Sequence, residues 1–436
     1  MRPSRLIYWL LPLTILAGAG SWLLLRGQDD LDAPGEPVIP IEWVQDLHAS
    51  IGNELSELKP MDQVVDSFMN FWSIHGASLA VVRHDSLLYA RGYGKADATT
   101  PMTPGTCLRL ASVSKLLTAV GIMRLQEAGK LYLETPVFGP FGVLNRFDRY
   151  IRDDNYYLIT VEHLLRHQGG FTTRGGDVMF NTLSFMRKHG LSQPPSSDLL
   201  VQKEVARPLS FEPGTDQEYS NFGYLLLSLI IEEVSGLSYD AFMQQEVFEP
   251  ALCHAFRLGG DYLKDRLPGE SRYYTQPDDI PGASFDGKYE SVERCYGGNY
   301  ISGLYGAGGW TGSALELARL VCSIDGHGPV PDILDPFSVH QMTVWFDDDT
   351  YGLGWLDCKP DGEWTRTGSF AGTSALIKVY PDGEIWVFIT NTSTWRGSRF
   401  TRNSSALFRN LRSRFGTQLP RRDLFRISSF EENSLN

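Results

Sequence analysis

The chain has 436 residues, of which 42% are hydrophobic and 21% are charged, and its formal net charge is -13 at pH 7. This composition supports a large buried core and argues against a disordered chain. The acidic balance argues against nucleic acid as a partner, because phosphate binding requires a basic surface. The arginine-rich segment 396–426 is a local exception. It is typical either of a solvated helix face or of contact with an anionic membrane surface.

The first 26 residues carry a hydrophobic segment. An uncharged run at 6–25 follows Arg2 and Arg5. A run of this length can span the hydrocarbon core of a bilayer, whereas the small residues at 17–19 are typical of a cleavage site. We therefore predict a signal anchor or a signal peptide over 1–26. Either one places the rest of the chain outside the cytoplasm, and an anchor also attaches it to the membrane.

The sequence after residue 26 predicts an α+β fold that is divided into a linker, two domains and a tail. Residues 27–42 are rich in Asp, Gly and Pro, as in a linker. Strand patterns near both ends enclose a long, mostly helical middle. We expect a discontinuous α/β domain formed by 43–130 and 300–416, a mostly helical domain over 131–299, and a tail over 417–436.

Two strand pairs are expected within the α/β domain. The segment 76–94 has two β-rich runs joined at His84-Asp85, and 373–392 has two runs around Asp382-Gly383. Helices are expected around 43–74, from Ser112 to Gly129 and over 401–414.

The chain has five cysteines, and they are widely spaced: Cys107, Cys253, Cys295, Cys322 and Cys358. The absence of a C-x-x-C pair argues against a disulfide scaffold and a zinc ribbon, and an odd number leaves at least one unpaired in a monomer. The apolar sequence around Cys322, and the place of Cys107 just before an apolar helix, predict that both pack in the core.

The stretch "TVEHLLRHQGGF" places His163 and His167 four residues apart, which is the spacing of two metal ligands on one helix face. Position 164 is leucine, so the general base of a metalloprotease is missing, and no third ligand is evident. Thr160 fits the start of a helix and Gly169 its end. We expect no metal site here.

The stretch "LRLASVSKLLTAVGIMRLQEAG" contains Ser112 and, three residues later, Lys115. One interpretation is a helix cap whose neighbouring lysine extends to solvent. The other is a nucleophile beside the cation that activates it.

Two further motifs follow along the chain. Tyr219-Ser220-Asn221 stands on an expected loop before an apolar helix, and Arg366-Thr367-Gly368-Ser369 stands in an expected turn before a strand. Each motif alone is weak evidence for a site.

The three motifs, taken in this order, resemble those of the penicillin-recognising serine hydrolases. The similar branch contains class C β-lactamases, D,D-carboxypeptidases and related esterases. Other framework segments, including "FEPGT" and "YGLGW", extend the resemblance over roughly 60–415. The resemblance implies a β-lactamase/transpeptidase-like fold, with an antiparallel sheet flanked by helices and a mostly helical domain.

The family resemblance implies that Ser112 is the nucleophile. A serine hydroxyl needs a base, but lysine and tyrosine normally hold their protons at neutral pH. A phenol near the cations of Lys115 and Arg366 would shift toward phenolate, because opposite charge favours the ionised form. The resemblance therefore implies that Tyr219 and Lys115 together accept the Ser112 proton.

The resemblance also implies the substrate contacts. The backbone N–H groups of Ser112 and Ser369 would bind the oxyanion, and Asn221 would hold a substrate amide. Gly368, next to Thr367 in the motif, would keep the strand edge free for a substrate backbone.

Arg366 departs from the family, in which lysine or histidine usually stands at this position. Arginine cannot shuttle protons but binds carboxylates in a bidentate manner, which suits a peptide C-terminus or a β-lactam.

The sequence thus predicts an extracytoplasmic serine hydrolase that forms an acyl-serine intermediate with D-amino-acid peptides, esters or β-lactams. Cell-wall peptide is one such substrate, and no cofactor is expected. Two alternatives are a penicillin-binding receptor that acylates without turnover and a pseudo-enzyme that uses the cleft as a binding module. The stretch 171–210 is interpreted as an elaborated loop beside the cleft that reshapes specificity.

Overall fold

The computed structural model describes residues 56–276, 279–344, 351–394 and 396–425. The predicted segments 1–26 and 27–42, and the first part of the helix expected around 43–74, lie outside these residues. Among the described helices, none is by itself long and apolar enough to span a membrane. The pair Asn221–Ser235 and Tyr239–Phe248 reaches that length and composition only together, with a bend of 80°.

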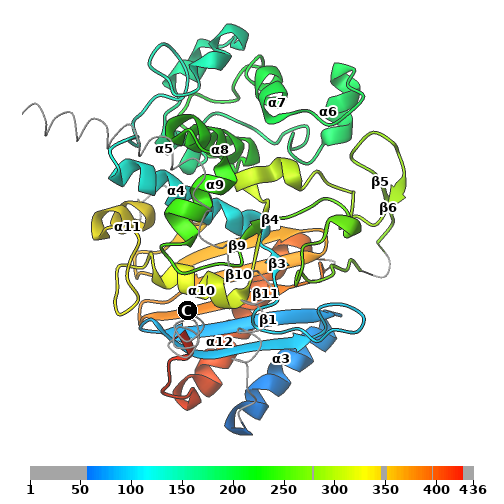
Figure 1. Ribbon diagram of the computed structural model, residues 1–436, viewed down its shortest axis with the longest axis vertical. Coiled ribbons are helices and arrows are strands. Elements are labelled where there is room, and N and C mark those ends of the chain that lie inside the picture. Colours follow the sequence, from blue (N-terminus) through cyan, green and yellow to red (C-terminus); the bar gives the residue numbers. More distant parts are fainter. Residues whose placement is uncertain (1–55, 277–278, 345–350, 395, 426–436) are drawn as a thin grey trace, which may run out of the picture. The chain divides into compact units, whose positions relative to one another are not determined.

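A six-stranded antiparallel sheet runs through the structure in the order β2-β1-β11-β10-β9-β8 (Figure 1). The N-terminal strand β1 pairs with the C-terminal strand β11, so the two ends of the described chain meet in the sheet. The strands are β1 (Gly76–Arg83), β2 (Ser86–Gly94), β8 (Asp357–Cys358), β9 (Trp364–Phe370), β10 (Thr373–Val379) and β11 (Glu384–Thr390).

Both predicted strand pairs are confirmed. β1 and β2 are joined at His84 and Asp85, whose φ angles are 46° and 58°. Two positive φ values at the centre of a two-residue turn match the right-handed twist of the flanking strands. β10 and β11 are joined around Asp382-Gly383, where Gly383 has φ 76°.

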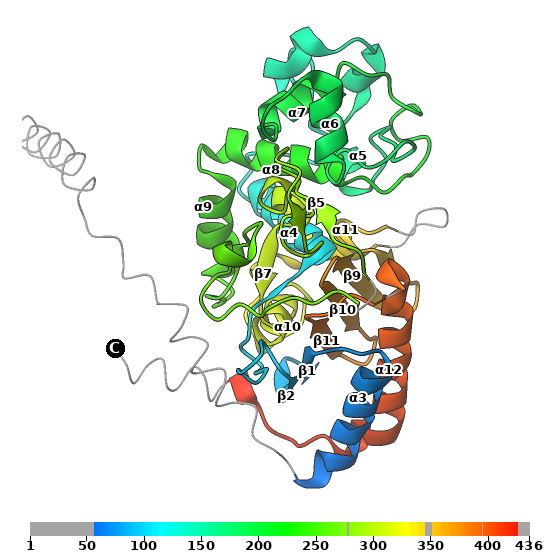
Figure 2. The same ribbon diagram turned by 90° about the vertical axis from the view of Figure 1, so that its right-hand side faces the viewer.

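The sheet is covered on both faces, because alternate side chains of each strand enter different hydrophobic clusters. In β1, Leu79 and Val81 join the cluster that includes α3 (Lys59–Phe71) and α12 (Thr401–Phe415). Ala80 and Val82 join the larger cluster on the other face. Figure 2 shows α3 and α12 side by side against one face of the sheet.

Between β2 and β8 the regular secondary structure is mainly helical, joined by long irregular segments. Helices α5, α6, α7 and α8 gather above the sheet, and α4 packs against α8 (Figure 1). The helices are α4 (Ser114–Glu127), α5 (Val161–Leu165), α6 (Thr182–His189), α7 (Ser197–Glu204), α8 (Asn221–Ser235), α9 (Tyr239–Met243), α10 (Ala314–Cys322) and α11 (Pro336–Thr343). The short strands are β3 (Leu108–Arg109), β4 (Arg257–Leu258), β5 (Gly282–Ala283), β6 (Ser291–Val292) and β7 (Trp310–Gly312).

Helix boundaries differ from the predictions in two places. The helix expected to begin at Ser112 begins at Ser114, because Ala111–Val113 form a 3₁₀ turn. Thr160 caps α5 as predicted, but α5 ends at Leu165 rather than near Gly169. His167 has φ 60°, which ends the helical conformation early. The predicted last helix is confirmed as α12.

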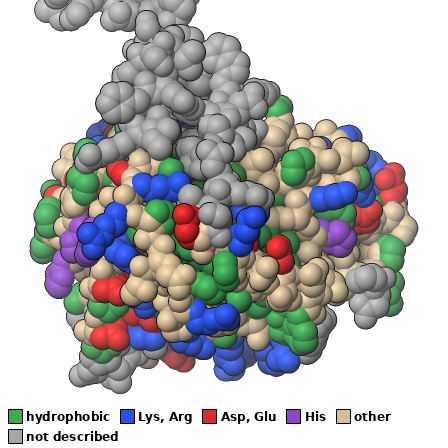
Figure 3. Space-filling model, turned by 90° about the horizontal axis from the view of Figure 1, so that it is seen from below, with side chains coloured by type: hydrophobic (Ala, Val, Ile, Leu, Met, Phe, Trp, Pro, Cys, Tyr) green, Lys and Arg blue, Asp and Glu red, His purple; other side chains and the backbone are tan. Residues whose placement is uncertain are grey.

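All five cysteines are buried and none of them forms a disulfide bond, which confirms the core positions predicted for Cys107 and Cys322. On α12, Arg412 pairs with Glu384 on β11, whereas Arg409 and Arg414 are exposed. Basic side chains lie among acidic and apolar ones on the lower face (Figure 3).

Candidate active site

Ser112 lies in a single 3₁₀ turn, Ala111–Val113, between β3 and α4. The N-cap of α4 is Val113, and no side chain caps this helix, so the interpretation of Ser112 as a helix cap is wrong. The preceding Ala111 is buried and has φ 48°, a strained conformation for a residue with a Cβ. The turn places Ser112 on the wall of a cavity of about 510 Å³.

Lys115 points into the protein, so the expectation that it extends to solvent is also wrong. Its Nζ lies 3.3 Å from Ser112 Oγ, 2.6 Å from Asn221 Oδ1 and 2.5 Å from the Ala307 carbonyl. Burial lowers the pKa of Lys115, Tyr219 opposes this, and the charge of Arg366 lowers the pKa further. The net pKa is below the ordinary value, so more of Lys115 is in the neutral form that can accept a proton than in a free lysine.

Tyr219 stands beside two cations. Its Oη lies 3.4 Å from Arg366 Nη2, and Lys115 Nζ lies 4.9 Å from the centre of its ring. Burial alone raises the pKa of this phenol, but the charges of Lys115 and Arg366 and hydrogen bonds to Lys115 and Ser112 outweigh it. The pKa is therefore lowered, in the direction expected from the sequence.

His167 supports Tyr219 and is not arranged as a metal ligand. Its ring centre lies 4.4 Å from that of Tyr219, and its Nδ1 accepts the Ser220 N–H at 3.1 Å. His163 instead uses its Nδ1 to accept the Thr160 N–H at the start of α5. In the described part of the chain, no three His, Cys, Asp or Glu side chains gather as a metal site.

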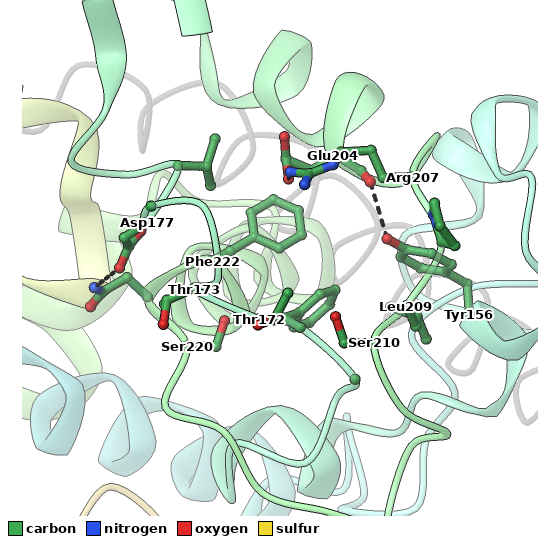
Figure 4. Close-up of a pocket in the computed structure, with 16 residues that line it drawn as sticks. Tyr156, Thr172, Thr173, Asp177, Glu204, Arg207, Leu209, Ser210, Ser220 and Phe222 are labelled. Atoms are coloured by element: carbon green, nitrogen blue, oxygen red, sulfur yellow. Dashed lines mark hydrogen bonds and ion pairs between the residues drawn. The ribbon is translucent and has the colours of Figure 1, made fainter. Parts of the chain in front are cut away.

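Asn221 is the first residue of α8 rather than a loop residue, and Ser220 caps that helix by accepting the Gly223 N–H. Its Oδ1 accepts from Lys115, while its Nδ2 donates to Asp177 Oδ2 at 2.5 Å. The dashed line at Asp177 in Figure 4 marks this contact. Asp177 comes from the stretch 171–210, so this stretch reaches the site.

The predicted Arg-Thr-Gly-Ser motif lies within β9 rather than in a turn before it. Thr367, Gly368 and Ser369 line the cavity with Ser112. Arg366 is buried instead, and its Nε donates to the Ser112 carbonyl at 2.9 Å. The predicted contact between Arg366 and a substrate carboxylate is therefore corrected, because two of its nitrogens are bound to Ser112 and Tyr219.

Gly368 is required by the close approach of two backbones. A Cβ at this position would lie 2.1 Å from the Leu110 carbonyl and 3.0 Å from the Ser112 nitrogen. The glycine therefore allows β9 to pack directly against the nucleophile turn. This packing is a different reason for glycine from the free strand edge expected earlier.

Comparison with known proteins identifies the family. A sequence profile of the beta-lactamase family matches residues 61–409, which is most of the chain. The chain belongs to the beta-lactamase family. The predicted family and its α+β fold are confirmed.

Two curated proteins are also similar to the chain. A penicillin-binding protein of Bacillus subtilis (strain 168) is 34% identical over 41% of this chain and 36% of its own length. The esterase EstB of Burkholderia gladioli is 31% identical over 44% of this chain and 48% of its own length. Both matches thus cover less than half of the relative.

A solved structure supports the same fold. The D-amino acid amidase from Ochrobactrum anthropi SV3, in complex with D-phenylalanine, superposes with a TM-score of 0.62 at 19% identity. The superposition covers 84% of this chain and 99% of the amidase. Its agreement with the beta-lactamase profile establishes the fold. In this fold Ser112 and Tyr219 line one cavity, and the buried Lys115 contacts Ser112.

The sequence analysis missed two arginines that line the cavity of Ser112. Arg399 and Arg402 line it with Ser112, and both are exposed. Within the described residues, neither guanidinium has an ion-pair partner. The sequence signal was the arginine-rich segment 396–426, which was interpreted as a helix face or a membrane contact.

Proposed function

We propose that the chain is an extracytoplasmic serine hydrolase that works through an acyl-serine intermediate on peptides, amides or esters of D-amino acids. The family consists of serine hydrolases, and its relatives include an esterase and a D-amino acid amidase. The observation that carries the proposal is the contact of Lys115 Nζ with Ser112 Oγ at 3.3 Å, beside a Tyr219 whose pKa is lowered.

The proposed reaction begins with attack of Ser112 Oγ on the substrate carbonyl carbon. The hydroxyl proton passes to the pair formed by Lys115 and Tyr219. The tetrahedral oxyanion accepts hydrogen bonds from the backbone N–H groups of Ser112 and Ser369. Collapse of the intermediate breaks the bond to the leaving amine or alcohol, which takes the proton from Tyr219.

Deacylation reverses the roles with water as the nucleophile. Tyr219 or Lys115 takes a proton from the water, whose oxygen attacks the acyl carbon. The ester bond to Ser112 breaks, and the serine oxygen recovers the proton. The reaction needs no cofactor.

The charge of the cavity supports substrates that carry a carboxylate. Arg399 and Arg402 present two cations on its wall, whereas Arg366 is bound to the Ser112 carbonyl. A peptide C-terminus or a β-lactam carboxylate would be attracted to such a wall. The location outside the cytoplasm rests on the hydrophobic segment at 1–26.

The test is intact-mass spectrometry of the full chain and of Ser112→Ala with three probes: a fluorescent penicillin, p-nitrophenyl acetate and D-phenylalanine amide. We expect an adduct or turnover in the wild type and neither in the variant. The faster probe indicates the substrate class. A permanent penicillin adduct without turnover of the other probes would support a receptor, and no reaction with any probe would overturn the proposal.

Location is tested separately with intact spheroplasts that express the full chain. Added protease should degrade the domain while leaving a cytoplasmic marker intact. Protection of the domain under these conditions would reject an extracytoplasmic location.

A further inference from the structure

Lys115 Nζ has four hydrogen-bonding neighbours, and two of them can only accept hydrogen bonds. These two are Asn221 Oδ1 at 2.6 Å and the Ala307 carbonyl at 2.5 Å. Carbonyl oxygens have no proton to give, so each contact requires an N–H from the lysine. The other two neighbours are hydroxyl groups, Ser112 Oγ at 3.3 Å and the phenol of Tyr219.

This arrangement determines where a neutral Lys115 directs its lone pair. A neutral amine has two N–H groups and one lone pair. When Asn221 and Ala307 take both N–H groups, the lone pair is left for the side that holds the Ser112 and Tyr219 hydroxyls, which is the side from which Lys115 must accept a proton. The alignment fails if the Asn221 amide is turned over, because its NH₂ group would then meet the N–H groups of Lys115.

Asp177 determines the orientation of that amide. Its Oδ2 accepts a hydrogen bond from Asn221 Nδ2 at 2.5 Å. A carboxylate accepts but does not donate, so it faces the NH₂ end of the amide and leaves the oxygen for Lys115. Replacing this acceptor with a donor would favour the opposite orientation of Asn221.

Asp177 is itself held in place. Its Oδ1 accepts the Met179 N–H at 2.9 Å and closes a turn. The preceding Gly175 and Gly176 have φ angles of 92° and 105°, in a region that favours glycine. The two carboxylate oxygens therefore have different partners, one in the turn and one on Asn221.

We propose that Asp177 is a positioning residue which fixes the amide orientation of Asn221 and thereby directs Lys115 toward Ser112. The proposal rests on the serine hydrolase function stated above. Asp177 is not among the residues that line the cavity of Ser112, whereas Asn221 is, so the proposed effect of Asp177 passes through Asn221.

Two variants of Asp177 separate amide orientation from support of the turn. Asp177→Asn keeps a side-chain oxygen for the Met179 N–H but turns an NH₂ group toward Asn221. Asp177→Ala removes the turn contact but leaves Asn221 free to keep its oxygen on Lys115. The proposal therefore predicts opposite rankings: the asparagine variant is slower in acylation, and the alanine variant has the lower melting temperature.

The experiment measures the acylation of the full chain by p-nitrophenyl acetate at saturation, together with the KM and the melting temperature. We expect the acylation rate constant of Asp177→Asn to fall roughly 10- to 100-fold, as for the loss of a hydrogen bond to a charged group, with little change in KM. Asp177→Ala should lose less activity. The control Asp198→Ala removes an exposed acid of the same stretch, on α7, and should acylate as the wild type does.

Acylation of Asp177→Asn at the wild-type rate would overturn the proposal. So would a slower acylation by Asp177→Ala than by Asp177→Asn, because that order indicates a role in the turn alone. A wild-type chain that forms no acyl-enzyme would instead reject the proposed function, so the two failures are distinguishable.

Discussion

The guanidinium of Arg366 binds the backbone of Ser112, with Nε donating to the Ser112 carbonyl at 2.9 Å and Nη2 contacting the same oxygen. Nη2 also lies 3.4 Å from Tyr219 Oη. One buried side chain therefore supports the nucleophile turn and places a positive charge beside the phenol. A planar guanidinium with several fixed N–H groups can make both contacts at once, whereas a lysine ammonium is a single point charge.

The charge of Arg366 should affect the pH dependence of the reaction. Besides burial, which raises the pKa of Tyr219 and lowers that of Lys115, the charge of Arg366 lowers the pKa of both groups. Arg366→Gln removes this charge, so both pKa values rise and the acid limb of the kcat/KM profile moves to higher pH. The direction is the same whichever of the two groups is the base.

The control for this experiment is Arg366→Lys, which keeps the charge but loses the bidentate contact with Ser112. We expect its acid limb to stay closer to that of the wild type, while its maximal rate falls. The measurement is kcat/KM for p-nitrophenyl acetate across the pH range. An unchanged limb in Arg366→Gln would contradict the electrostatic role assigned to Arg366.

Gly368→Ala tests the packing of β9 against the nucleophile turn. The new Cβ would meet the Leu110 carbonyl at 2.1 Å, and this neighbour is backbone and cannot move aside cheaply. We expect the free energy of unfolding to fall by about 1–3 kcal/mol, as for overpacking of a core. Activity should fall more than stability, because the displaced turn carries Ser112. Chemical denaturation and ester hydrolysis measure the two effects.

Gly328→Ala is the matched control, since a Cβ at Gly328 would have no neighbour within 4 Å and its φ is not positive. Its stability and activity should equal those of the wild type. Equal behaviour of the two alanine variants would show that β9 does not need a glycine for this contact.

The buried His167 predicts a loss of stability in acid. Burial, followed by the charges of Lys115 and Arg366, holds its pKa well below 6.5. Below pH 6.5 the unfolded chain therefore binds a proton that the folded chain does not bind, so the free energy of unfolding decreases as the pH falls. Above this pH His167 is neutral in both the folded and the unfolded chain, so it contributes no pH dependence to the free energy of unfolding.

His167→Gln should have a weaker dependence of melting temperature on pH, because glutamine does not titrate. The melting temperatures of both proteins are measured between about pH 8 and about pH 5. The slopes of melting temperature against pH are compared, because the altered packing of residue 167 against Tyr219 lowers stability equally at every pH and does not change the slope. Parallel curves would show that His167 does not contribute to acid sensitivity.

Local patterns explain what the sequence predicted well. The turn at Asp382-Gly383 and the strands around it depend on neighbouring residues, so the hairpin could be recognised directly. The spacing of Ser112 and Lys115 likewise allowed the prediction that the two side chains lie close together. Tyr219 is 147 residues from Arg366 along the chain, so only the family resemblance could bring them together.

The sequence missed contacts that depend on the direction of side chains. Arg366 was recognised as a cation, but its residue type does not show whether it points to a substrate or to the Ser112 carbonyl. Asp177 meets Asn221 across 44 residues, from a stretch with no motif of its own. Arg399 and Arg402 belong to an arginine-rich segment whose position at the cavity depends on the packing of α12.

The exposed cations on the cavity wall should select for anionic substrates. Arg402 lines the cavity from α12, and no described residue forms an ion pair with it. Arg402→Ala should raise KM for a carboxylate-bearing D-amino-acid peptide about two- to fivefold, which is the range for exposed charge pairs. The KM of the corresponding peptide amide, which lacks the carboxylate, should change little.

Arg409→Ala is the control, because Arg409 is exposed on the same helix and does not line the cavity. Hydrolysis of the peptide and of its amide is measured for all three proteins at low and high salt. Since salt screens exposed charges, the difference between wild type and Arg402→Ala should shrink as the ionic strength rises. An equal rise in KM for both substrates would indicate that the substitution changes the shape of the cavity rather than removing an attraction to the carboxylate. This result would contradict a role of Arg402 in carboxylate recognition.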